Sequence, residues 1–171
     1  MKTLYLLRHA KSDWDDPGMR DIDRPLASRG RKAARRIGHA LAGLGAPPDL
    51  ALCSSARRAT ETLDRVLAAL DDRPVAETRE DLYLSGWLVL LGAVQEVPDL
   101  VGRVLLVAHN PDLHVLTRQL AGGGAPEALR ALAEGYPTGA LAVLEFPGPG
   151  WSDVAPGTGM LRHFIRPREL I

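Results

Sequence analysis

The sequence predicts an α/β fold, a three-layer sandwich in which helices cover both faces of a mostly parallel central sheet. Short runs that are apolar at every position alternate along the chain with longer segments whose apolar residues recur every three or four positions. The short runs are typical of strands buried on both faces, and the longer segments are typical of helices. The chain has 171 residues, of which 46% are hydrophobic, enough for one domain with its own core. We therefore expect a single domain over residues 1–171, with its ligand site beyond the carboxyl ends of the strands.

The first quarter of the chain predicts a strand, a loop and a helix. Residues 4–7 form a compact apolar run, which predicts a strand. Residues 11–27 are polar and contain two prolines and a glycine, so we expect a loop. Apolar residues between Ser28 and Leu44 share one face of a helix. Five cations crowd the first half of this helix and are interpreted mainly as a solvated face: Arg29, Arg31, Lys32, Arg35 and Arg36.

The middle of the chain repeats the alternation. Residues 50–53 predict a second short strand, and the helical spacing of apolar residues predicts a helix over about 57–70. A short strand at 75–76 and a helix over 87–94 follow. Residues 104–108 are the clearest buried strand in the chain, because all of them are apolar. This alternation predicts parallel strands joined by helical crossovers.

The last third ends the pattern with strands near the carboxyl terminus. Residues 113–120 and 126–134 predict helices, and residues 141–144 predict a strand. The stretch 147–159 is rich in proline and glycine and predicts a loop, which leads to a last strand near 160–166.

Composition and charge exclude several classes of protein. Lys plus Arg and Asp plus Glu each number 21, so the formal net charge is zero and we expect neither nucleic acid nor membrane as a partner. The only cysteine, Cys53, excludes an internal disulfide framework and a cysteine-rich zinc site. No apolar run approaches the roughly 20 residues that span a bilayer. The apolar start is too short for a signal peptide, which predicts a cytoplasmic protein.

Cationic side chains follow three of the predicted strands. Arg8 and His9 end the first strand, Arg57 comes shortly after the second, and His109 ends the central one. Because parallel strands end at the same edge of a sheet, we expect these side chains to lie close together. An arginine beside a buried strand is costly unless an anion meets it, and its planar fork matches a phosphate. The sequence therefore predicts a phosphoryl-binding site at this edge.

Each of these residues also has a purely structural interpretation. His9 taken alone could be a hydrogen-bonded core histidine, and His109 could cap the helix that follows it. Arg57 and Arg58 could be ordinary first-turn arginines, although a cation at a helix amino terminus opposes the macrodipole and so favours an anion nearby. The remaining histidines and the cysteine are interpreted as surface or core residues: His39, His114, His163 and Cys53.

Four segments carry a resemblance to a known family. Residues 6–12 resemble the Arg-His-Gly motif of the histidine phosphatase superfamily, in the branch that includes the phosphoglycerate mutases. Residues 24–30 resemble the segment that opens the family's first helix, residues 54–62 its Ser-x-x-Arg-Ala-x-x-Thr segment, and residues 107–110 the segment with the second histidine. All four occur in family order, which makes the resemblance specific. The short chain and its first motif look most like the SixA-type phosphohistidine phosphatases.

The resemblance implies a mechanism without a metal or another cofactor, in which His9 is transiently phosphorylated. Arg8, His109 and one arginine of the pair Arg57 and Arg58 would then bind the phosphoryl group. The usual spelling of the third motif selects Arg58, whereas counting from the first serine fits Arg57. Two further cations, Lys11 and Arg24, could extend the positive charge around the phosphoryl group, or could equally be solvated loop residues.

Three departures from the family pattern concern the site. Ala10 replaces the usual glycine, and Asp15 stands where mutases carry an asparagine, so we expect its carboxylate to point away from phosphate. The general acid of the family falls on Glu80 or on Asp81, depending on which neighbouring residue anchors the motif. A phosphohistidine substrate needs such an acid less than an alkyl phosphate does, because imidazole leaves more readily than an alcohol.

These observations lead to one main functional prediction and two alternatives. The main one is a phosphatase that removes phosphate from phosphohistidine in a partner protein, such as a phosphohistidine-containing domain. The first alternative is an enzyme of the same superfamily that acts on a small phosphate ester, as a phosphomonoesterase or a mutase. The second alternative is a phosphoprotein-binding module without catalysis, although the presence of all the expected cations argues against it.

Overall fold

The computed structural model describes residues 1–170. Across them, the strands form one sheet in the order β3-β2-β4-β1-β6-β7-β5. Four of the six neighbouring strand pairs are parallel, and the other two involve β6, which runs antiparallel to both β1 and β7. The α/β class and the mostly parallel sheet predicted from the sequence are therefore confirmed. The strands are β1 (Lys2–Arg8), β2 (Leu50–Ser54), β3 (Val75–Arg79), β4 (Arg103–Ala108), β5 (Ala121–Gly124), β6 (Leu141–Phe146) and β7 (Gly159–Ile165).

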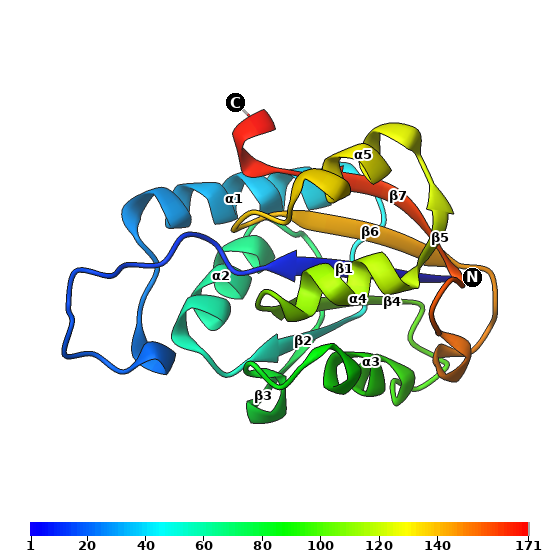
Figure 1. Cartoon of the computed structure of the whole chain (residues 1–171), viewed down its shortest axis with the longest axis horizontal. Coiled ribbons are helices and arrows are strands. Elements are labelled where there is room, and N and C mark those ends of the chain that lie inside the picture. The colour runs from blue at the N-terminus through cyan, green and yellow to red at the C-terminus, as the bar shows by residue number, and fades with distance from the viewer. Residues whose placement is uncertain (171) are drawn as a thin grey trace.

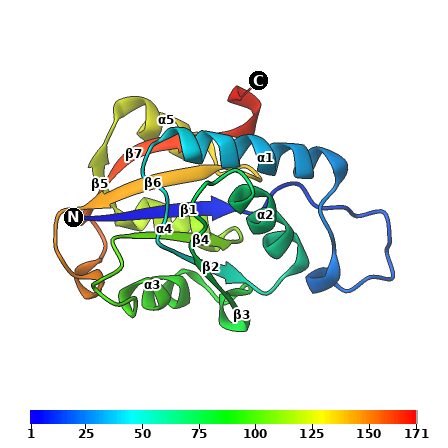
Figure 2. The same ribbon diagram turned by 180° about the vertical axis from the view of Figure 1, so that it is seen from behind.

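Helices cover both faces of this sheet. Figures 1 and 2 view the molecule from opposite sides, with α4 in front of the sheet in the first and α2 in front in the second. Successive residues of the central strands accordingly enter two separate cores: Leu4 and Leu6 pack with α3, α4 and α5, whereas Tyr5 and Leu7 pack with α1 and α2. The three layers follow from this alternation. The α-helices are α1 (Ser28–Gly43), α2 (Arg57–Leu67), α3 (Trp87–Gln95), α4 (Asp112–Leu120) and α5 (Pro126–Glu134).

The structure corrects the predicted elements in several places. The helix predicted to reach residue 70 ends at Leu67, and the short strand at 75–76 extends to Arg79 as an exposed edge strand. Strand β5 was not predicted, because its sequence is Ala-Gly-Gly-Gly. A Cβ atom on Gly122 would lie 2.1 Å from a backbone oxygen, so only glycine lets this segment approach its neighbour.

Two predicted loops contain short 3-10 helices. Asp21–Asp23 form one within the polar segment 11–27, and Trp151–Asp153 form another within the stretch 147–159. Trp151 is fully buried and its indole N–H donates to the Val101 carbonyl at 2.6 Å, so the second loop contributes to the core.

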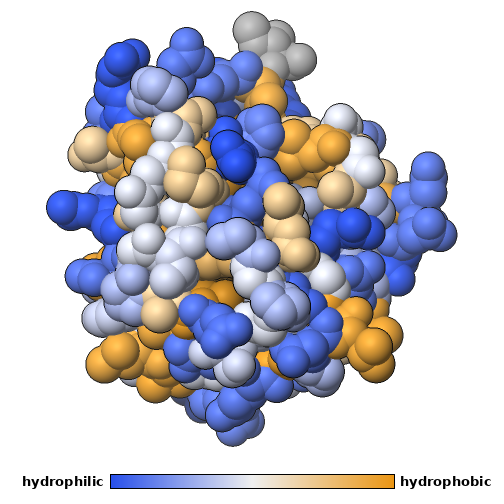
Figure 3. Space-filling view, turned by 90° about the vertical axis from the view of Figure 1, so that its right-hand side faces the viewer, coloured by the Kyte–Doolittle hydropathy of each residue, from blue (hydrophilic) through white to orange (hydrophobic). Residues whose placement is uncertain are grey.

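The face at the amino ends of the parallel strands shows no concentration of one kind of side chain. Figure 3 shows hydrophilic and hydrophobic residues interspersed over it. None of the helices within residues 1–170 combines the length and the apolar character that crossing a bilayer requires.

Candidate active site

Three neighbouring parallel strands end at one edge of the sheet, on the left in Figure 1. β1 is followed by His9, β4 by His109, and β2 ends at Ser54. The chain forms a cleft of about 210 Å³ at this edge. Among its lining residues are two histidines and three arginines that come from separate segments of the chain: Arg8, His9, Arg24, Arg58 and His109. The sequence motifs therefore converge on one hollow, as the strand-end argument predicts.

His9 is held as a neutral ring with one nitrogen available. The side chain is 6% exposed, and its Nδ1 lies 2.8 Å from the carbonyl oxygen of Ala10. A carbonyl only accepts, so Nδ1 carries the proton and Nε2 carries the lone pair. Burial lowers the pKa of His9 to about 4, and the positive charges of Arg58 and Arg8 add to this effect against the opposing hydrogen bond to Ala10. At neutral pH the lone pair of Nε2 is therefore free without the help of a base.

His109 lines the same cleft, and a serine hydroxyl holds its ring. Its Nε2 lies 2.7 Å from the Ser54 hydroxyl, and that hydroxyl oxygen already accepts the N–H of Ala56 at 3.3 Å. A hydroxyl group has one proton and two lone pairs, so Ser54 can donate to Nε2 while it accepts from Ala56, and in that tautomer the proton of His109 lies on Nδ1. This Nδ1 is buried and has no hydrogen-bond partner among residues 1–170. Burial lowers the pKa of His109 to about 3, with a further contribution from His9, whose ring centroid lies 5.1 Å away.

Arg8 is fixed beside the two histidines. Its Nη1 donates to the carbonyl of Tyr136 at 2.9 Å, and the Asn110 side-chain amide donates to the same oxygen at 2.9 Å. The Nε of Arg8 is buried and finds no partner in the described part of the chain. Burial lowers the pKa of Arg8, and the positive charge of Arg58 lowers it further. A bound anion would relieve both effects, since it would supply a partner and a compensating charge.

The structure separates the two candidate arginines at the start of α2. The side chain of Arg58 is 4% exposed and lines the cleft. That of Arg57 is 55% exposed, points away from the cleft and pairs with Glu61 at 3.3 Å. The structure therefore brings Arg58, and not Arg57, together with the histidines.

Sequence reasoning missed Asp21, which connects two buried cations. Its Oδ2 accepts from Arg58 Nη2 at 3.0 Å and from the Tyr83 hydroxyl, and its Oδ1 accepts from Arg24 Nε at 3.1 Å. Partial burial acts to raise the pKa of Asp21, but the hydrogen bond from Tyr83 and the charge and hydrogen bonds of the arginines outweigh it and lower the pKa to about 2. This carboxylate thus stays ionised and orients both guanidinium groups.

Arg24 is buried and lines the cleft, so it is not a solvated loop cation. It is 6% exposed, donates from Nη1 to the Ser12 hydroxyl at 2.6 Å, and stacks over the Trp14 ring with its Cζ atom 3.3 Å from the ring centroid. Lys11 also lines the cleft, together with Ser12 and Thr138.

The two candidate general acids lie outside the cleft. Glu80 and Asp81 are exposed residues of a short 3-10 helix that follows the edge strand β3. Asp81 makes two hydrogen bonds to Arg79, at 2.7 and 3.0 Å. Asp15 is exposed as well and does not line the cleft. In the described part of the chain, the lining of this cleft includes neither an aspartate nor a glutamate.

Two further residues that the sequence analysis singled out, Ala10 and Cys53, are buried in the core. Ala10 is fully buried, and its N–H donates to the Thr62 hydroxyl at 3.0 Å. The structure therefore accommodates a methyl group at the position where the family usually has glycine. Cys53 is buried, and burial raises the pKa of its thiol to about 12, which makes it a core residue without nucleophilic character.

We expect the two site histidines to stay neutral well below the usual pKa of 6.5. Nitrogen NMR of the rings should show His9 neutral with its proton on Nδ1 down to about pH 4, and His109 neutral to about pH 3. Because the unfolded chain takes up these protons near pH 6.5 and the folded chain does not, the free energy of unfolding should fall as the pH falls through this window. A His9 ring that titrates at its usual value would contradict the assigned environment.

The fold and the cleft together define a class of protein. A neutral buried histidine among arginines, at the carboxyl edge of a mostly parallel sheet, suits an enzyme that binds and transfers a phosphoryl group.

Comparison with known proteins places the chain in this class. The chain belongs to the histidine phosphatase superfamily: residues 4–83 match the family model for its branch 1. The structure of a candidate SixA phosphohistidine phosphatase from Nakamurella multipartitia superposes on this chain with a TM-score of 0.81 at 30% identity, and the match covers 97% of this chain and 96% of the other. A second such candidate, from Agrobacterium tumefaciens, gives a TM-score of 0.77 at 31% identity over 96% of this chain and 97% of its own. An uncharacterised protein of Mycobacterium tuberculosis is 37% identical over 95% of this chain and 100% of its own length. The protein is therefore a phosphatase.

Proposed function

We propose that the protein hydrolyses phosphohistidine in a partner protein through a phosphorylated intermediate on His9. The observation that carries this proposal is the cleft itself, which offers a neutral histidine and several cations but, among residues 1–170, no carboxyl group in its lining. A phosphorylated alcohol needs a proton from an acid as it leaves, whereas the imidazole of phosphohistidine depends on one much less. The two candidate SixA phosphatases that resemble this chain are consistent with the same substrate class.

The residues of the cleft would divide the reaction into two transfers. In the first, His9 Nε2 attacks phosphorus and the bond between phosphorus and the substrate nitrogen breaks; the substrate ring, protonated by solvent on its other nitrogen, leaves as neutral imidazole with the bonding electron pair. In the second, water attacks phosphorus, the bond to His9 breaks and its electron pair returns to Nε2 of the neutral ring, and the protons of the water leave with inorganic phosphate or pass to solvent. Arg8, Arg58 and the Nδ1–H of His109 would hold the phosphoryl oxygens in both transfers, because charge develops on these oxygens each time.

The two alternative functions fit the cleft less well. A small-molecule phosphomonoesterase or a mutase would need a proton donor for an alcohol leaving group, and Glu80 and Asp81 lie outside the cleft lining. A binding module without catalysis does not agree with membership of a phosphatase family.

We also propose that residues 1–171 act as one domain, supported by the single sheet, and that the protein works in the cytoplasm.

The substrate class can be tested with a series of leaving groups. We expect hydrolysis of a phosphohistidine peptide and of an activated aryl phosphate, and a value of kcat/KM for an alkyl phosphate that is lower by roughly 10²–10⁴, the usual contribution of a general acid. An alkyl phosphate hydrolysed as fast as phosphohistidine would contradict the proposal.

The same series tests the two excluded carboxylates. The variants Glu80→Gln and Asp81→Asn should change kcat/KM by less than about twofold on all three substrates, because both side chains are exposed and outside the cleft lining. A loss confined to the alkyl phosphate would identify the substituted residue as a general acid after all.

A further inference from the structure

We propose that a basic groove beside the active cleft docks an acidic segment of the phosphoprotein substrate. The basic groove is the hollow lined by Lys11, Arg29 and Arg168, with apolar walls from Ala33, Pro137 and Pro167. The proposal rests on the proposed function, since the docked segment belongs to the protein that carries the phosphoryl group.

The basic groove continues the active cleft. Its volume is about 380 Å³, and both Lys11 and Thr138 line the groove and the cleft alike. An occupant of the groove therefore lies next to the group bound at His9. Residues that flank the phosphorylated side chain of a protein substrate are in that position, whereas a small phosphate ester is too short to reach it.

The chain holds the groove together from three distant segments. Lys11 accepts the N–H of Ala27 at 2.9 Å, and a Cβ atom on Gly30 would lie 2.1 Å from the same Lys11 oxygen, so α1 begins directly against the site loop. On the other side Gly139, with φ +77°, donates to the backbone oxygens of Arg8 and His9 and lies against the ring of Pro167. Figure 1 shows the carboxyl-terminal turn above α1. The basic groove is thus anchored to the backbone of the catalytic residues.

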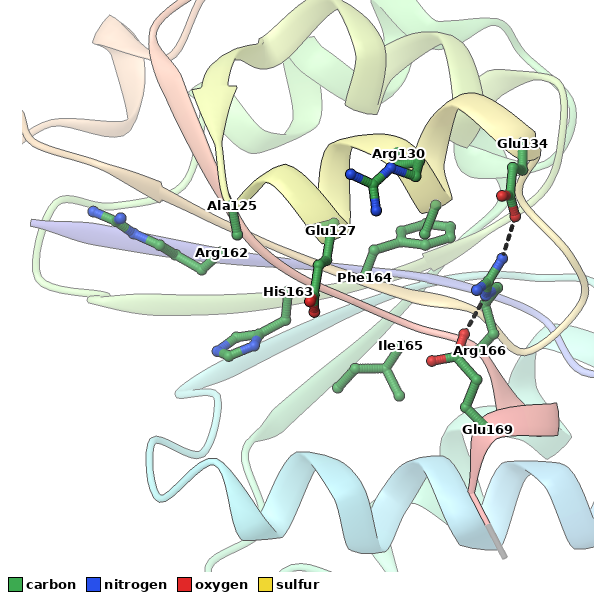
Figure 4. Close-up of a pocket in the computed structure, with 12 residues that line it drawn as sticks. Ala125, Glu127, Arg130, Glu134, Arg162, His163, Phe164, Ile165, Arg166 and Glu169 are labelled. Carbon is green, nitrogen blue, oxygen red and sulfur yellow. Dashed lines mark hydrogen bonds and ion pairs between the residues drawn. The ribbon is translucent and has the colours of Figure 1, made fainter.

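The cations of the basic groove are not neutralised within the described chain. Lys11, Arg29 and Arg168 form no ion pair with any of residues 1–170. Arg166 also borders the groove, but it pairs with Glu134 at 2.7 Å and with Glu169, as the neighbouring hollow in Figure 4 shows, so its charge is compensated. Within residues 1–170, the lining of the groove includes no acidic side chain.

Helix stability does not account for Arg29. Arg29 lies in the first turn of α1, where the macrodipole is already positive and a cation is unfavourable. The sixteen residues of this helix include no acidic residue, although the whole chain has equal numbers of both signs. A neutral protein that gathers uncompensated cations beside its active cleft is complementary to an acidic partner surface.

The test compares histidine phosphopeptides that differ only in their flanking residues, either glutamate or glutamine. We expect the wild-type protein to prefer the glutamate peptide in kcat/KM. The double variant Arg29→Gln and Arg168→Gln should lose about five- to tenfold on the glutamate peptide, the range for two exposed charge contacts, and change little on the glutamine peptide or on phosphoramidate. The preference should also shrink as salt is raised. Lys11 is left in place because it lines the cleft.

A matched control removes two arginines from the opposite edge of the sheet. Arg73 precedes β3 and Arg118 lies in the last turn of α4; both are exposed. The double variant Arg73→Gln and Arg118→Gln changes the net charge equally and should keep the wild-type preference. An equal loss in both double variants would overturn the proposal, because it would reflect overall charge and not the groove.

Docking and catalysis are distinguished by measuring binding on its own. The unphosphorylated glutamate peptide should bind the wild-type protein more tightly than the Arg29 and Arg168 double variant does, whether or not turnover occurs. Turnover of neither phosphopeptide would overturn the proposed function, while the binding measurement still decides the groove. Equal binding by both proteins would overturn the groove. Loss of binding to phosphatidylglycerol vesicles in the variant, without any preference between peptides, would also overturn it in favour of a membrane surface.

Discussion

Replacing His9 with alanine should leave a folded protein that no longer hydrolyses phosphohistidine. The side chain supplies the only protein nucleophile in the proposed mechanism, and its hydrogen bond runs to the adjacent Ala10 carbonyl, so the rest of the fold does not depend on it. We expect kcat/KM to fall by a factor on the order of 10⁴–10⁶, as for the loss of a covalent nucleophile in other enzymes. Intact-mass spectrometry after brief exposure to a phosphodonor should show added phosphate on the wild-type protein and none on the variant.

His39 provides the matched control for this experiment. It is an exposed residue of α1 and lies outside the cleft, so His39→Ala should keep both turnover and labelling. Circular dichroism should give the same spectrum for both variants. Residual turnover of His9→Ala within tenfold of wild type, or phosphate on another residue at wild-type yield, would refute a mechanism that passes through His9.

The architecture could be predicted because apolar patterning dictates it directly. Runs such as residues 104–108 are apolar at every position because both faces of the central strands are covered. The carboxyl ends of parallel strands meet at one edge of the sheet, so the sequence alone predicts that His9 lies near His109. Strand β5 was missed for a related reason: its glycines are selected by the close approach of neighbouring backbone, which leaves no pattern of side chains to detect.

The details of the cleft depend on contacts that local sequence does not encode. Asp21 reaches Arg58 across 37 positions of the chain, and its nearer contact with Arg24 is only an ordinary spacing of three residues. The position of Glu80 and Asp81 depends on how β3 ends at the margin of the sheet, and the motif alone left either one as the acid. One signal was available, however. Arg58 shares the face of α2 that also carries Thr62 and Val66, which marks it as the inward residue of the pair.

Adjacent arginines in α2 should therefore respond very differently to the same substitution. Arg58→Ala removes donors from the cleft and leaves Asp21 with one fewer cation to balance it, so an incoming phosphoryl group meets weaker attraction and stronger repulsion. We expect kcat/KM on a phosphohistidine peptide to fall by about 10²–10³, the range for removing one donor to a developing charge. Because Arg58 would hold the bound and the reacting phosphoryl group alike, tungstate should also bind more weakly to this variant.

Arg57→Ala is the matched control, since it removes the same side chain one position earlier. Its guanidinium is largely exposed and, in the part of the chain that the structure describes, pairs only with Glu61, a type of contact that contributes little to stability. Turnover and tungstate binding should remain within about twofold of wild type. Arg58→Lys adds a further distinction, because it keeps the positive charge but loses the planar fork, and we expect an activity between wild type and Arg58→Ala. If Arg57→Ala were the more damaging variant, the bound phosphoryl group would have to lie on the outer side of α2, and the assignment of the cleft would be wrong.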